Sequence, residues 1–267
     1  MFLSKKGFWK IMIMAICYFI LGTFLIVIAS ICALIGLEYK LALILGIFMV
    51  LMIAPIICFG RYAEGKGKLI NMGNKLVRND LKPAEFINEY NTLKNSTNLM
   101  INKPSFEVLH LLAVAYESLR DYENTITIVN EMIEIAPKKK KTLALIIKTS
   151  ILFSNDKNEE AEALFQSLQG VKLDALSYYM LDSVLKSDRA QAKGDYKVAE
   201  TYNLTLLSKS FPKLDALGKL FVHNSLAEIY LKLEEIEKAK EHYQYCVEFG
   251  GETAIKTNAI IMLEKLH

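Results

Sequence analysis

Two long runs of apolar residues lie near the start of the chain. Residues 11–37 form a run of 27 without a charge or a proline, and residues 41–59 form a run of 19 with one proline near its end. As α-helices at about 1.5 Å per residue, these runs span about 40 and 28 Å, and the hydrocarbon core of a bilayer is about 30 Å thick. Because only three residues separate the runs, the pattern predicts a hairpin of two transmembrane helices, about 11–37 and 41–59, within residues 1–60.

Basic residues outside the two runs indicate their orientation. Three lysines precede the first run, three basic residues follow the second within residues 61–68, and the connection between the runs is neutral. The positive-inside rule then places both termini and the remainder of the chain in the cytoplasm. A cleaved signal peptide is the alternative, but its apolar region typically has about 7–15 residues and precedes a polar mature chain. The first run is longer and a second follows at once, so we expect an integral membrane protein in contact with membrane lipid.

From about Leu69 onward, apolar residues recur at helical spacing and no segment alternates as a β-strand does. Asp80 to Pro83 has the composition of a helix start with a proline in the first turn, which predicts a helix over residues 84–94. The sequence therefore indicates an all-α chain. Its predicted parts are a transmembrane hairpin at 1–60, a flexible basic juxtamembrane linker at 61–68, a helical lead-in at 69–104 and a repeat region at 105–267.

One pattern of large and small residues occurs four times in the repeat region. The first copy places large and small residues on one helix and then on the next: Leu109, Leu112, Ala113, Tyr116, Thr125, Val129 and Met132. The last copy repeats most of this arrangement: Leu226, Ala227, Tyr230, Ala239, Tyr243 and Cys246. A third copy is centred on Gly194, Asp195, Tyr196 and Ala199, and a weaker one on Asn155 to Ala161 with Phe165 and Leu168. Aligned in this way, the copies start near Phe106, Thr142, Met180 and Leu220.

These residues make the region similar to the tetratricopeptide repeat family. The resemblance implies helix pairs that stack into an α-solenoid, because one pair cannot bury its apolar face alone. It also implies that a protein or peptide partner binds a concave face built from the first helix of each pair. Carrying over the inward positions of the family gives these partner-binding residues: His110, Glu117, Asp188, Gln191, Asn224, Glu228 and Lys232. The basic block Lys138 to Lys141 is expected in a solvated loop between two copies.

No pattern in the chain indicates catalysis or a cofactor. The four histidines form no HExxH pattern, and neither GxSxG nor a Cys/His set with zinc-ligand spacing occurs. His223 and His242 can approach each other across the last helix pair, but two histidines fall short of a predicted metal site. Gly60 to Gly67 resembles a phosphate-binding loop, yet Gly67 stands where a hydroxyl must bind Mg²⁺. We therefore expect no enzymatic activity, no metal and no cofactor.

The charge balance bears on the class of partner. The chain carries 32 basic and 29 acidic residues, and residues 1–60 hold four of the basic and one of the acidic ones. The remainder is balanced and offers no basic field for nucleic acid. We expect a membrane-anchored scaffold or adaptor that binds proteins through its repeats. The alternative is a structural or assembly subunit of a larger membrane complex, in which the hairpin makes the main contact. Abundant Lys, Asn and Ile are typical of an AT-rich genome, which favours a bacterial cell membrane.

Overall fold

The computed structural model describes residues 22–23, 65–95, 104–173, 179–208 and 214–266. The chain divides into two compact units, Met1–Gly65 and Lys66–His267. Apart from Gly22 and Thr23, the predicted membrane spans at 11–37 and 41–59 lie outside the described residues, so the hairpin stays a prediction. Within the described ranges, no helix combines the length and the apolar character needed to cross a membrane.

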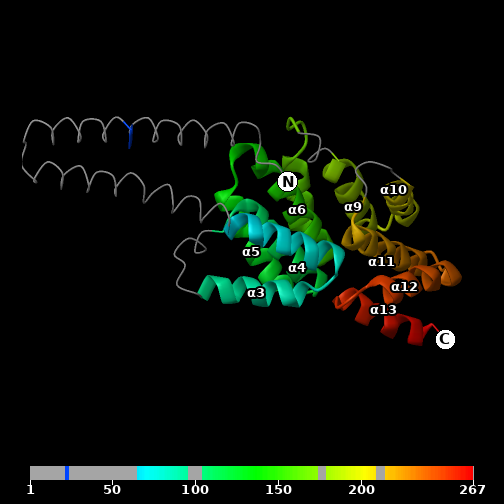
Figure 1. The fold of residues 1–267 in the computed structure, drawn as a ribbon. Helices are drawn as coiled ribbons and strands as arrows, with labels where there is room; N and C mark the ends of the chain where they lie inside the picture. Colours follow the sequence, from blue (N-terminus) through cyan, green and yellow to red (C-terminus); the bar gives the residue numbers. More distant parts are fainter. Residues whose placement is uncertain (1–21, 24–64, 96–103, 174–178, 209–213, 267) are drawn as a thin grey trace, which may run out of the picture. The chain divides into compact units, whose positions relative to one another are not determined.

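All regular elements in the described part of the second unit are helices, which agrees with the predicted all-α class for that part (Figure 1). An α-helix over residues 65–73 continues into a π-helical turn. The elements from that turn onward are η1 (Asn74–Asn79), α3 (Pro83–Asn95), α4 (Phe106–Ser118), α5 (Tyr122–Ile135), α6 (Lys138–Ser154), α7 (Asn158–Ser167), η2 (Met180–Leu185), α9 (Lys186–Ala192), α10 (Tyr196–Ser208), α11 (Ala216–Lys232), α12 (Ile236–Phe249) and α13 (Ala254–Lys265).

Four helix pairs share one turn geometry. The pairs are α4–α5, α6–α7, η2/α9–α10 and α11–α12, and each turn holds one residue in the left-handed region: Arg120, Asp156, Gly194 and Glu234, with φ of 56°, 57°, 80° and 62°. In each turn the next residue donates its backbone N–H to the carbonyl five positions earlier, as in a Schellman cap. The turns are 36, 38 and 40 residues apart, which confirms the predicted spacing. The two middle copies, weaker in sequence, close their turns in the same way.

Small residues allow the two helices of each pair to pack closely. The first position of this kind on the second helix is occupied by Thr125, Ala161, Ala199 and Ala239, and each is at most 1% exposed. Larger side chains would force the helix axes apart, because interaxial distance depends on the side chains at the contact. The predicted close packing at Ala113, Ala199, Ala227 and Ala239 is confirmed by their burial, and Thr125 and Ala161 are buried in the same way.

The basic block is helical, contrary to the sequence expectation of a loop. Lys138 to Lys141 form the first turn of α6, which follows Pro137 at the N-cap. The ammonium group of Lys140 pairs with Glu107 of α4, and this offsets the unfavourable placement of a cation near the positive end of a helix. The second copy consequently starts before Thr142, and α11 likewise starts at Ala216 rather than near Leu220.

The end of the predicted linker is also helical. Residues 65–68 belong to the helix that leads into η1, and Lys66 Nζ lies 3.1 Å from Glu107 Oε2. At Gly73 this helix approaches α4 so closely that an added Cβ would lie 2.7 Å from Leu111 Cδ1. The lead-in is thus packed against the first helix pair.

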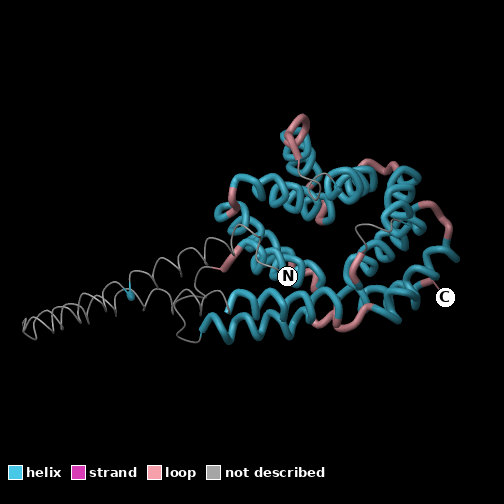
Figure 2. The backbone as a smooth tube through the Cα atoms, turned by 45° about the horizontal axis from the view of Figure 1, so that its top comes forward, coloured by secondary structure: helices cyan, strands magenta, loops and turns pink. Residues whose placement is uncertain are grey.

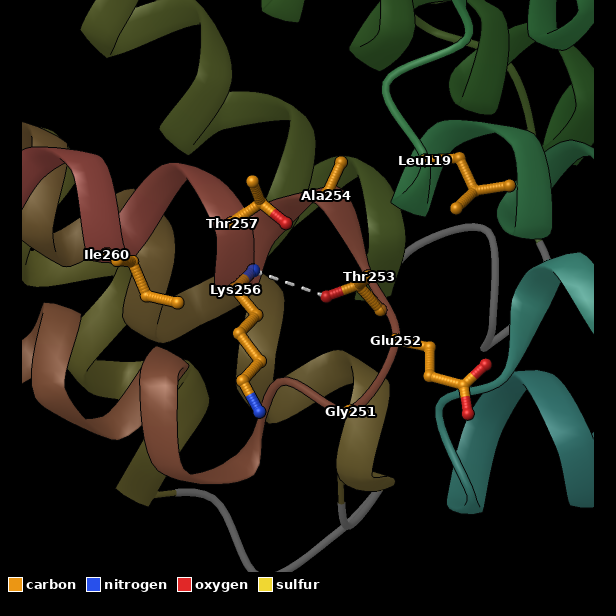
Figure 3. Close-up of a pocket in the computed structure, with 8 residues that line it drawn as sticks. All are labelled: Leu119, Gly251, Glu252, Thr253, Ala254, Lys256, Thr257 and Ile260. Atoms are coloured by element: carbon orange, nitrogen blue, oxygen red, sulfur yellow. Dashed lines mark hydrogen bonds between the residues drawn. The ribbon is translucent and has the colours of Figure 1, made fainter.

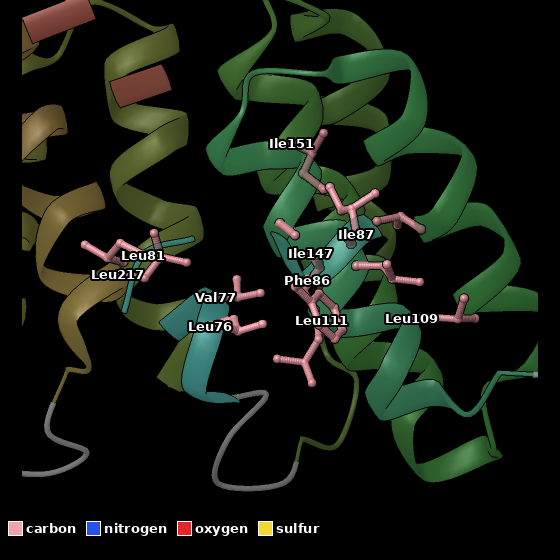
Figure 4. Close-up of a cluster of buried hydrophobic side chains, with 14 of the residues drawn as sticks. Leu76, Val77, Leu81, Phe86, Ile87, Leu109, Leu111, Ile147, Ile151 and Leu217 are labelled. Atoms are coloured by element: carbon pink, nitrogen blue, oxygen red, sulfur yellow. The ribbon is translucent and has the colours of Figure 1, made fainter. Parts of the chain in front are cut away.

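The lead-in also contacts the last helix pair, so the two ends of this unit meet. Leu76, Val77 and Leu81 belong to the same buried apolar cluster as Leu217 of α11 (Figure 4). The backbone N–H of Glu252 donates to the Leu81 carbonyl at 2.8 Å. The lead-in and the four helix pairs therefore follow a curved path, in which η1 packs against α11 of the last pair (Figure 2). We call the contact of residues 76–82 with α11 and the α12–α13 turn the seam.

Candidate functional site

The predicted partner-binding residues lie on equivalent faces of the first helices. In the four pairs, the residue six positions before the left-handed turn residue is Val114, Ser150, Asp188 and Glu228 in turn. The residue three positions before it is Glu117, Phe153, Gln191 and Leu231. The predicted residues Asp188 and Glu228 therefore occupy equivalent positions in their pairs, and so do Glu117 and Gln191. Ser150 is equivalent to Asp188, but it was not predicted from the sequence, although it stands 36 residues after Val114.

Two half-buried carboxyl groups come together on this face. The Ser150 hydroxyl of α6 donates a hydrogen bond to Asp188 of α9. Burial raises the pKa of Asp188 to about 7, although that hydrogen bond favours the charged form. Burial and the charge of Asp188 together raise the pKa of Glu117 to about 7. Neither carboxylate forms an ion pair with a cationic side chain of the described residues. A partly protonated, acidic spot thus spans α4, α6 and α9.

His110 lies on the same helix as Glu117, among charged groups of both signs. Burial lowers its pKa to about 4. The charges of Arg78 and Lys140 also lower it, and those of Glu107 and Asp215 oppose this. Arg78 Nη1 donates to Asp215 Oδ2 at 2.8 Å across the seam. His110 is therefore a neutral imidazole near pH 7, close to the contact that joins the lead-in to α11.

Asn224 and Glu228 of α11 are used in contacts within the protein. Asn224 Nδ2 donates to Glu228 Oε1 at 3.0 Å, and Arg120 Nη2 donates to the same oxygen at 3.2 Å. Arg120 is the left-handed residue of the α4–α5 turn, so this bridge links the first pair to the last. Asn224 is buried, whereas Lys232 is exposed at the C-terminal end of α11.

Gln191 also holds neighbouring pairs together. Its Nε2 donates to Ser225 Oγ at 3.0 Å, and Asn203 Nδ2 donates to Ser225 Oγ at 3.2 Å and to Ser187 Oγ at 2.7 Å. Buried polar groups of this kind cost stability unless they are hydrogen-bonded. Of the seven predicted residues, Gln191, Asn224 and Glu228 therefore form contacts within the protein that the sequence did not predict.

His223 of α11 and His242 of α12 meet, as the spacing of the last copy had suggested. Their Nδ1 atoms are 2.8 Å apart, so one ring carries the shared proton. His223 stacks on Tyr245 with ring centroids 3.6 Å apart, and His242 stacks on Tyr230 at 5.5 Å. Burial lowers the pKa of both rings, that of His223 to about 4.

A surface cleft of about 410 Å³ lies elsewhere, between Leu119 and the start of α13 (Figure 3). Its lining includes Glu252 and Lys256 but none of the predicted partner-binding residues. The Thr253 hydroxyl accepts a hydrogen bond from the Lys256 backbone N–H, which satisfies part of the helix start. In the part of the chain that the structure describes, no group of three or more His, Cys, Asp or Glu side chains is arranged to hold a metal ion.

Comparison with protein families supports the repeat interpretation. The tetratricopeptide repeat profile matches residues 106–139 and 222–249. These segments are the α4–α5 and α11–α12 pairs, the copies in which the sequence pattern is most complete. The two middle pairs are related to them by turn geometry and by buried small residues. Neither the curated proteins nor the solved structures contain a match to the chain.

Proposed function

We propose that this chain is a membrane-anchored scaffold that binds another protein through its helix pairs. The observation that carries the proposal is the recurrence of one helix-pair geometry in four consecutive pairs, two of which match the tetratricopeptide repeat profile. Repeats of this kind form extended surfaces that bind proteins or peptides. In the proposal, the hairpin at residues 1–60 lies in a bacterial cell membrane, and both termini and the repeats lie in the cytoplasm.

The proposed contact surface is the face of the first helices that carries Glu117, Asp188 and His110. These side chains differ from Gln191, whose amide contacts Ser225 of the next helix pair, and from Asn224, whose amide contacts Glu228 of the same helix. A partner can form new charge-assisted hydrogen bonds with the two carboxylates, which form no ion pair with the described cations. Lys232 marks the exposed end of the same face.

Site-specific photocrosslinking in native membranes tests this assignment. A photoreactive amino acid in place of Lys232 should trap a partner, whereas the same group in place of Gln244, exposed on the second helix of the pair, should not. Both positions lie on the α11–α12 pair, so expression and anchoring are matched. A partner trapped at Gln244 but not at Lys232 would contradict the assignment. Trapping only from a position within residues 11–37 would favour the alternative, an assembly subunit that contacts its complex through the hairpin.

Cysteine labelling tests the proposed topology, but the native Cys246 is unsuited to it. Cys246 is fully buried, and burial raises the pKa of its thiol to about 12, so it stays protonated and unreactive. We expect Gln244→Cys to remain unlabelled by an impermeant thiol reagent in intact cells and to become labelled after the membrane is opened. The wild type measures the background from the other cysteines. Labelling of the variant in intact cells would place the repeats outside the cytoplasm.

A further inference from the structure

The two histidines of the last helix pair bring two ring nitrogens within 2.8 Å of each other. His223 is on α11 and His242 on α12, and both are only partly buried, so an ion can reach them from solvent. From the approach of their Nδ1 atoms we infer that His223 and His242 bind one divalent transition-metal ion, preferably copper(II) or nickel(II). Nothing in the sequence pattern of the repeats requires histidine at either position.

Metal binding replaces the hydrogen bond of the free pair. In the free pair, one Nδ1–H donates to the other Nδ1 across 2.8 Å. When the ion binds, both Nδ1 lone pairs face it, and the shared proton moves through solvent to Nε2 of the same ring. Each imidazole keeps one proton and stays neutral, so no net proton is released. Because the midpoint of the two nitrogens is too close to both for metal–nitrogen bonds of about 2.0–2.1 Å, the ion lies to one side of the line that joins them, and each ring turns to direct its Nδ1 lone pair at it.

The two rings are held in place before any ion arrives. Tyr245 covers His223 with an interplanar angle of 10°, and Tyr230 lies nearly parallel to His242 at 9°. Stacking on these tyrosines restricts tilting of the two imidazole rings, while each ring can still turn within its own plane to direct Nδ1 at an ion. Ligands fixed in this way lose little conformational entropy on binding.

The distance between the nitrogens indicates which ions fit. With metal–nitrogen bonds of about 2.0–2.1 Å, two nitrogens lie about 2.9 Å apart at a right angle and about 3.3 Å apart at a tetrahedral angle. The observed 2.8 Å is close to the right-angle arrangement. Tetragonal coordination is typical of copper(II) and nickel(II), and copper(II) binds tightest in the divalent series. Zinc(II) would require the rings to move apart. Water completes the coordination, since no third ligating side chain of the described residues joins the pair.

Charged neighbours on both helices have opposite effects. Lys219, one turn before His223, opposes a cation, and its charge is among the causes that lower the pKa of His223. Glu241, adjacent to His242 on α12, attracts one. A bound ion would tie α11 to α12 and would stabilise the folded state by mass action.

The test is titration of the full chain in detergent micelles with copper(II) chloride alone. We expect one tight equivalent for the wild type, and a loss of more than about tenfold in affinity for His223→Gln and for His242→Gln. His267→Gln is the matched control, because it removes a histidine that is not one of the pair, and its affinity for copper(II) should equal that of the wild type. Electron paramagnetic resonance should show two equivalent nitrogen ligands in the wild type and in the control.

Two further measurements check the fold of the variants and the preference among metal ions. Circular dichroism of each variant verifies that the helices remain, and nickel(II) and zinc(II) titrations should give weaker binding in that order. Wild-type affinity in both folded variants, or a spectrum without two nitrogen ligands, would overturn the inference. Tighter binding of zinc(II) than of copper(II) would overturn the right-angle geometry on which it rests.

Discussion

At pH 8, Glu117→Gln should make the protein more stable than the wild type. The wild type must keep a half-buried carboxylate charged at that pH, next to Asp188, whereas glutamine is neutral. At about 1.4 kcal/mol for each pH unit between the ordinary pKa and the folded value of about 7, this charge costs up to about 3 kcal/mol. Asp188→Asn should act in the same direction, because burial raises its pKa to about 7 as well.

The effect should depend on pH with a defined sign. A carboxyl whose pKa is raised on folding binds its proton more tightly in the folded state, so its contribution to the free energy of unfolding is favourable at low pH. That contribution is lost as the pH rises from the unfolded value, about 4.5 for Glu117, through the folded value of about 7. The advantage of Glu117→Gln over the wild type should therefore grow across this window and level off above it.

Comparison of variant and wild type is needed because histidines act in the opposite sense. His110 and His223 have lowered pKa values of about 4, so their contribution becomes more favourable as the pH rises toward 6.5. Denaturant unfolding of the wild type and of Glu117→Gln at pH 4.5, 6 and 8 isolates the carboxyl. Glu134→Gln, an exposed position on α5, is the control. A stability difference that stays constant across the three pH values would contradict the prediction.

Gly251→Ala should lower the free energy of unfolding by about 3 kcal/mol. Gly251 has a φ of 55°, and a left-handed conformation costs an alanine about 1–2 kcal/mol. An added Cβ would also lie 2.5 Å from Leu81 Cβ and 2.7 Å from the Leu81 carbonyl oxygen. Relieving that overlap must shift the backbone at the seam, where Glu252 donates to the same carbonyl, and overpacking typically costs about 1–3 kcal/mol.

Gly194→Ala separates the two contributions. Gly194 has a φ of 80°, but an added Cβ there meets nothing within 4 Å. It should therefore show the conformational cost alone, about 1–2 kcal/mol. Thermal denaturation of both variants measures the difference. Equal destabilisation by the two substitutions would show that the close approach of Gly251 to Leu81 contributes nothing.

The repeat pattern predicted the helix pairs because it records local constraints. Ala113, Ala227 and Ala239 are buried where helices cross, and such positions tolerate only small side chains. Ala161 of the weaker second copy is buried in the same way, although that copy has no tyrosine at the position of Tyr116. In contrast, the turn residues Arg120, Asp156 and Glu234 adopt a conformation that favours glycine. Among these four turns, only the one at Gly194 has the glycine that predicts a left-handed residue from the sequence.

The candidate face was predicted in outline and corrected in detail. Register alone placed Glu117 and Asp188 on the first helices. It did not predict that Ser150 donates to Asp188, or that Gln191 and Asn224 are engaged in hydrogen bonds within the protein. Side-chain partners on other helices depend on how the pairs stack, and this stacking is set by packing over the whole unit rather than by any local pattern.

The sequence by itself determined the helical class, the spacing of the copies and the two apolar runs that predict a membrane hairpin. Each of these follows from a periodicity or a transfer free energy that a short segment carries alone. The tertiary structure decided that residues 66–82 pack against both α4 and α11, and it thereby created the seam at Leu81 and Gly251. It also brought His223 within 2.8 Å of His242. These contacts join residues distant in the chain, and their energies arise only when the stacked helices fix the geometry.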